Sequence, residues 1–117
     1  MNQLQSEALI HLMLAARYAD KKLSLIETDD FQKQVDKLPW NSGTGQSLFI
    51  QQATATVRKA LATDETTQEL LQAKCAPFTD SQSKLDAFRH IESLLLVDGM
   101  DPKESDFLTQ LKSILKT

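Results

Sequence analysis

Apolar residues recur at helical spacing along most of this chain. In the first segment they form one broad stripe, made of Leu4, Ala8, Leu9, Leu12, Met13, Ala15, Ala16 and Ala19. A stripe this wide is typical of a helix that is covered on several sides, so we expect the first helix to be the central one. A narrower stripe in the third segment predicts an inward face made of Phe49, Ile50, Ala53, Val57, Ala60 and Leu61.

Turn residues divide the pattern into six predicted helices. Pro39 and Pro77 stop two of them, because a residue that precedes proline is pushed out of helical geometry. The predicted helices span residues 3–20, 24–38, 46–62, 65–75, 80–98 and 102–116. No segment alternates like a strand, and three Gly and three Pro are few for a turn-rich β protein. The sequence therefore predicts one all-α domain over residues 1–117, a compact bundle of about six helices.

A short acidic turn occurs twice between predicted helices. The first copy runs over 19–27 and the second over 97–104, with one residue fewer. Each contains an Asp at a helix end, then a Ser or Asp with a Glu three positions later, as in Ser24–Glu27 and Asp101–Glu104. This spacing is that of a capping box, in which the two side chains satisfy helix N-terminal amides.

The similarity extends into the flanking helices. Apolar positions before and after each turn match at an offset that changes by one residue across the loop. The chain is therefore expected to contain two similar helical hairpins that bury their apolar faces on one another.

The two turns, within a small all-helical chain, resemble the tellurite-resistance TerB-like family. Ala19-Asp20 through Glu27 keeps the spacing of that family's turn with Lys21 in place of Gly, and Val97-Asp98-Gly99 through Glu104 keeps the Gly. The resemblance implies a bundle of six or seven helices in a stress-resistance context, with no established catalytic reaction. It also implies that acidic residues around the turn are metal-binding candidates.

Two interpretations of these acidic residues stay open. A divalent cation could be bound by carboxylates of the turns, whose candidate ligands are Asp20, Glu27, Asp98, Asp101 and Glu104. Hard cations take six or more oxygens, however, and one turn supplies only two or three carboxylates. Capping of helix ends and acceptance of loop amides is therefore the favoured interpretation, with no cofactor required.

Trp40 is the candidate contact for a protein partner. It lies in the loop 39–45, and a groove between helices near it could hold a partner helix. The alternative, which we favour, is that Trp40 folds back on the core, since large aromatic side chains seldom stay wholly exposed. The partner and the oligomeric state have no signature in the sequence.

Charge and cysteine content narrow the remaining classes. The net charge is −3 and the basic residues are not clustered, which argues against a nucleic-acid partner. The lone Cys75 cannot form an internal disulfide, the N-terminus is unlike a secretory signal, and no apolar run could span a bilayer. We expect a cytoplasmic, non-enzymatic interaction module, with metal binding or sensing as the alternative function. A hydrolase is disfavoured because no nucleophile–base set is evident.

Overall fold

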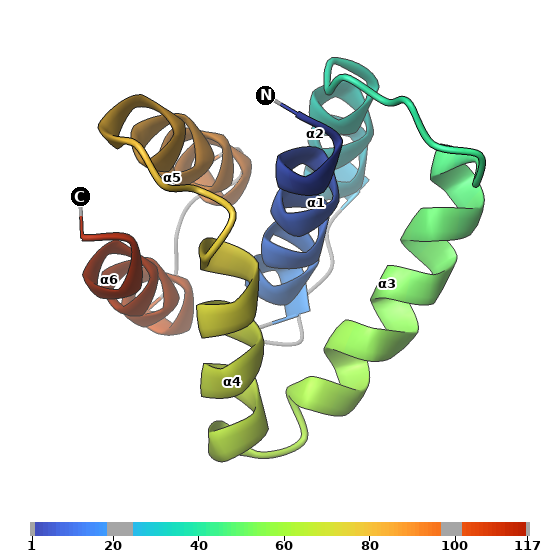
Figure 1. Ribbon diagram of the computed structural model, residues 1–117. Helices are drawn as coiled ribbons and strands as arrows, with labels where there is room; N and C mark the ends of the chain where they lie inside the picture. The colour runs from blue at the N-terminus through green and yellow to red at the C-terminus, as the bar shows by residue number, and fades with distance from the viewer. Residues whose placement is uncertain (1, 19–24, 97–101, 117) are drawn as a thin grey trace.

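The first helix lies at the centre of the molecule and the other helices surround it (Figure 1). The computed structural model describes residues 2–18, 25–96 and 102–116, without the side chains of 25–28. The helices are α1 (Gln3–Tyr18), α2 (Leu25–Asp36), α3 (Gln46–Ala60), α4 (Asp64–Cys75), α5 (Ser81–Leu96) and α6 (Pro102–Leu115). No strand occurs in this part of the chain, so the all-α prediction is confirmed.

α1 contacts all five other helices, which explains its burial. Eleven of its 16 residues are buried, including Leu9, Ile10 and Leu12 at 0% exposure. The prediction of a central first helix is confirmed. The radius of gyration of 13.0 Å is about that of a compact chain of this length, which is about 13 Å.

Side-chain caps begin several helices. The Asn2 carboxamide oxygen accepts from the Gln5 amide at 2.8 Å, and the Gln5 side chain accepts from the Asn2 amide at 3.2 Å. This reciprocal cap at α1 was not predicted. Thr63 caps α4 by accepting from the Thr66 amide at 3.1 Å, which agrees with one of the two predicted caps. The predicted caps Ser24 and Asp101 lie outside the described residues.

The helix ends agree with the predictions to within about two residues where they are described. α2 ends at Asp36, and α3 ends at Ala60 rather than Ala62. The last described residues of α1 and α5 are Tyr18 and Leu96, so the predicted ends at Asp20 and Asp98 lie outside the described residues.

The predicted core needs two corrections. Leu4 belongs to the predicted stripe of α1 but is 63% exposed, because its first-turn face, shared with His11, looks between α3 and α4. In α3 only Ala53 and Val57 are buried. The other four predicted positions, Phe49, Ile50, Ala60 and Leu61, are only partly buried.

The faces of α2 and α4 follow the predictions. Phe31, Val35 and Leu38 are buried, as are Leu70 and Leu71. The Arg17 guanidinium of α1 lies 5.1 Å from the centre of the Phe31 ring, which adds a cation–π contact between α1 and α2.

Candidate functional site

The predicted metal ligands lie mostly where the structure gives no geometry. Asp20, Asp98 and Asp101 lie outside the described residues, and so does the side chain of Glu27. Glu104 is described on α6, where it is only 4% exposed. The described parts of the chain bring no three acidic, His or Cys side chains together into a metal cluster, and the acidic turns stay a prediction.

Trp40 folds back onto α3, as predicted. Its indole Nε1 donates to the Thr44 carbonyl oxygen at 3.0 Å, which closes the loop 39–45 on itself. Its ring lies 5.1 Å from the Phe49 ring at a tilt of 57°. The side chain is partly buried against the core, so one part of the ring stays accessible at the start of α3.

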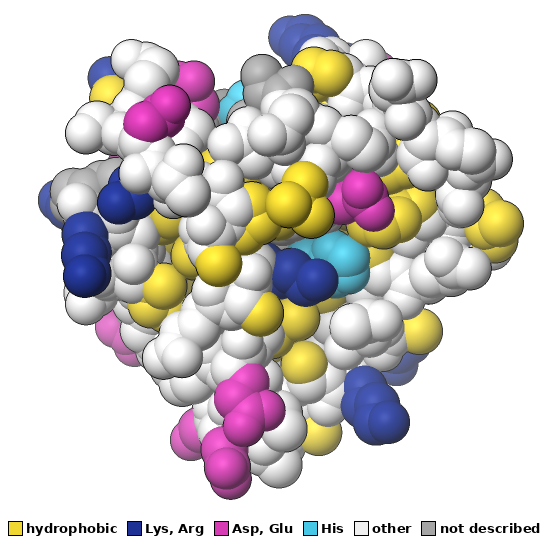
Figure 2. All heavy atoms as spheres, in the orientation of Figure 1, with side chains coloured by type: hydrophobic (Ala, Val, Ile, Leu, Met, Phe, Trp, Pro, Cys, Tyr) yellow, Lys and Arg dark blue, Asp and Glu magenta, His cyan; other side chains and the backbone are white. Residues whose placement is uncertain are grey.

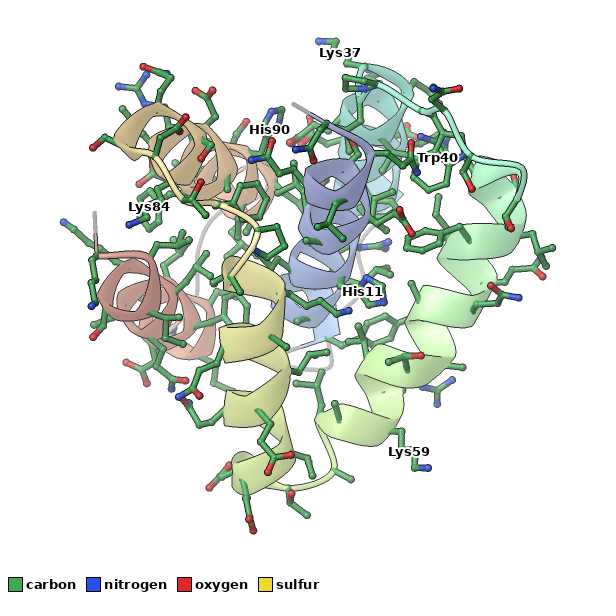
Figure 3. The ribbon with its side chains drawn as sticks, viewed as in Figure 1. His11, Lys37, Trp40, Lys59, Lys84 and His90 are labelled. Atoms are coloured by element: carbon green, nitrogen blue, oxygen red, sulfur yellow. The ribbon has the colours of Figure 1, made fainter. Side chains whose placement is uncertain are left out.

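His11 lies beneath this aromatic pair, on the face of α1 between α3 and α4 (Figure 3). Its Nδ1 is 2.9 Å from the Glu7 carbonyl oxygen, and since a carbonyl only accepts, Nδ1 carries the proton. The imidazole meets the Phe49 ring edge to face at 5.4 Å and 84°. Burial lowers the pKa of His11, and the positive charge of Lys74 lowers it further, against the Glu7 carbonyl, which raises it.

Apolar side chains are exposed around His11. Leu4 is 63% and Leu48 51% exposed, and Trp40 and Phe49 are partly buried beside them. Figure 2 shows hydrophobic side chains spread across the face formed by α4, α1 and α3, with the His side chain and a basic group among them. We name Leu4, Trp40, Leu48 and Phe49 the apolar surface.

A second site lies between α2 and α5, and sequence reasoning missed it. A pocket of about 320 Å³ is lined by Gln34 and Lys37 on one side and by Asp86, Arg89, His90 and Ser93 of α5 on the other. The α5 residues recur at helical spacing, which was a usable signal. Their partners on α2 could not be assigned before the packing of α2 on α5 was known.

Cys75 is buried at the end of α4, and burial raises the pKa of its thiol to about 12. At neutral pH the group is therefore a protonated thiol, without the thiolate that nucleophilic attack or metal ligation needs. This agrees with the expectation of a small packed residue.

Comparison with known proteins adds no relative: no protein-family model, curated protein or solved structure matches this chain. Within the described residues, no helix has both the length and the apolar character to cross a membrane.

Proposed function

We propose that this chain is a non-enzymatic protein-interaction module with a TerB-like fold, acting in a stress context similar to tellurite resistance. The observation that carries the proposal is the apolar surface of Leu4, Trp40, Leu48 and Phe49. Two large aliphatic side chains there are more than half exposed next to two half-buried aromatic rings. Exposed apolar groups gathered in one place, rather than scattered singly, are typical of protein interaction sites.

The partner segment is an amphipathic helix with acidic residues flanking its apolar stripe. The first twelve residues of α3, 46–57, contain no charged side chain, so this wall offers apolar and amide contacts. Basic residues stand at its margins, with Arg58 and Lys59 exposed in the last turn of α3 and Lys74 acting on His11 from α4. An acidic, amphipathic helix complements this arrangement in both shape and charge.

The described titratable groups support a non-enzymatic role. The Cys75 thiol stays protonated, and His11 and His90 both have pKa values lowered first by burial. The Nδ1 of each histidine is engaged, with the Glu7 carbonyl for His11 and the Gln34 side chain for His90. Neither histidine is paired with a hydroxyl or thiol that it could activate in these contacts.

The TerB-like fold is supported by the pairing of helices. α1 packs on α2, α5 packs on α6, and α1 packs against α5, as two facing hairpins would. An experimental structure in which 8–38 superposes on 86–115 would establish the repeat. Unrelated crossing angles in the two pairs would contradict it.

The test of the proposed surface compares two exposed leucines. Leu48 on α3 is 51% exposed and Leu96 on α5 is 56% exposed, so Leu48→Asp and Leu96→Asp are a matched pair. Proteins captured from the native cell by the wild-type chain should be retained by Leu96→Asp and lost with Leu48→Asp. A synthetic segment of the captured partner is then titrated into the purified chain.

The titration has a built-in probe, because Trp40 is the only tryptophan of the chain. Binding should shift its fluorescence, and we expect Leu48→Asp to weaken binding at least tenfold while Leu96→Asp changes it less than twofold. Equal losses in the two variants would contradict the proposal. A homodimer broken only by Leu48→Asp would instead assign the surface to a second copy of the chain.

A further inference from the structure

The pocket between α2 and α5 concentrates hydrogen-bond donors in a chain of net negative charge. Lys37 follows the end of α2, and Arg89, His90 and Ser93 stand on one side of α5. Figure 3 shows His90 on α5 near α2, and Lys37 at the far end of α2. The pocket holds two cations and one carboxylate, that of Asp86, so its formal charge is positive while that of the chain is −3.

A chain of hydrogen bonds fixes the polarity of His90. The Gln34 carboxamide nitrogen donates to the Asp30 carboxylate at 2.6 Å, because a carboxylate only accepts. The carboxamide oxygen therefore faces the His90 Nδ1 at 3.1 Å, so Nδ1 carries a proton. The other nitrogen, Nε2, is left for a ligand, and it becomes a donor once the imidazole is protonated.

We propose that this pocket binds a phosphate group, either as inorganic phosphate or as the phosphate of a small monoester. Arg89 offers a planar fork of donors, Lys37 a point charge and Ser93 a hydroxyl, and they approach from two helices. A tetrahedral group with several acceptor oxygens can meet donors from different directions, whereas a carboxylate has only two oxygens in one plane. The volume of about 320 Å³ lies at the lower end of small-molecule sites, which are about 300–1,000 Å³.

The charges around His90 give the site a distinctive proton linkage. Burial lowers the pKa of His90, the positive charge of Lys37 lowers it further, and the carboxylate of Asp86 raises it. Arg89 and, through Gln34, Asp30 are the other charged groups at the pocket. A bound phosphate dianion stabilises the imidazolium, so binding takes up a proton and raises the pKa of His90.

The experiment titrates the folded chain with sodium phosphate and follows the ring signals of both histidines by NMR. Sodium chloride at the same ionic strength is the control. We expect saturable changes at His90 and a rise of its pKa by at least half a unit. His11, whose charged neighbours are Glu7 and Lys74, is the internal control and should not move. Changes that do not saturate, or that chloride reproduces, would overturn the proposal.

Charge variants sharpen the assignment. Lys37→Gln and Arg89→Gln should each weaken phosphate binding at least fivefold, whereas Asp86→Asn should tighten it at least twofold by removing the opposing carboxylate. Lys84→Gln, on α5 outside the pocket, and Lys59→Gln, on α3, are matched controls expected to change binding less than twofold. Equal losses at pocket and control lysines would show general charge attraction and sink the site.

A second arm distinguishes the two sources of phosphate. Glycerol 3-phosphate is titrated beside inorganic phosphate under the same conditions. Tighter binding of the monoester would assign the pocket to a small phosphorylated metabolite, and tighter binding of the free ion would assign it to inorganic phosphate. Binding of neither would overturn the proposal.

Discussion

α1 and α3 have nearly the same length, 16 and 15 residues, yet the fold uses them in opposite ways. α1 buries eleven residues, among them the polar Ser6 and His11, whereas α3 buries only Ala53 and Val57. α1 is surrounded by every other helix, while α3 packs mainly on α1 and α4. The burial of a helix is therefore decided by how many faces its neighbours cover, in addition to its own apolar pattern.

The difference also separates stability from binding. The large side chains with almost no exposure, such as Leu9, Leu12 and Leu94, belong to α1 and the helices behind it. The half-covered apolar side chains Leu48 and Phe49 belong to α3. α1 thus holds the fold together, and α3 presents the surface on which the proposed interaction depends.

The largest expected effect comes from truncating the centre of α1. Leu12 is fully buried, so Leu12→Ala should lower the free energy of unfolding by about 3 kcal/mol, from lost transfer energy and the cavity left behind. Leu48→Ala on α3 should change it by no more than about 0.5 kcal/mol. Urea denaturation of both variants measures the contrast, and a Leu48→Ala cost close to that of Leu12→Ala would contradict it.

Native-state hydrogen exchange should show the same contrast without mutation. Amides in the middle of α1 should exchange only through global unfolding. Those of α3 should exchange through local opening that costs about 2 kcal/mol less, because few buried contacts hold this helix. The measurement compares residues 9–15 with residues 48–56 at neutral pH. Equal protection of both segments would show that α3 is as firmly integrated as α1.

Much of the fold was predictable from periodicity, because a helix needs only a local pattern. The six helices, the central position of α1 and the buried face of α2 all followed from apolar spacing and from proline positions. The reciprocal cap of Asn2 and Gln5 was missed, although its spacing matches the box that was recognised at Ser24.

What could not be predicted depends on which helices become neighbours. The exposure of Leu4 and the thin packing of α3 reflect the absence of a helix over that face. The α2–α5 pocket required Lys37 to be brought to His90 across more than fifty residues of chain. Ala87 is buried in α5 without having been expected in the core, since a small side chain barely marks a face.

His11 marks the boundary between the two helices and should make their packing sensitive to pH. Burial lowers the folded-state pKa of His11 below its ordinary 6.5, so the unfolded chain takes up the proton first as the pH falls. The stability is fully present above about pH 6.5 and is lost as the pH falls from there toward the folded-state pKa.

His90 has a pKa lowered in the same direction and adds to this loss. We expect the free energy of unfolding to fall between pH 7.5 and 5, and to fall less in His11→Gln than in the wild-type chain. Denaturant melts at several pH values measure both slopes. An unchanged slope in His11→Gln would show that protonation of His11 does not oppose the packing of α3 on α1.

The smallest expected effect concerns the acidic turns, one of which follows α1. A cation that bound them usefully would, at 100 times its dissociation constant, raise stability by about 2.7 kcal/mol. For a domain of this size, that corresponds to a rise in melting temperature of roughly 10 °C. We expect millimolar magnesium, calcium or zinc to move the melting temperature by no more than about 2 °C, because each turn offers too few oxygens for a hard cation. A large shift that is lost when Asp98→Asn and Glu104→Gln are combined would make metal binding the leading function. It would also show that the turns, rather than α1 alone, help to set the stability of the fold.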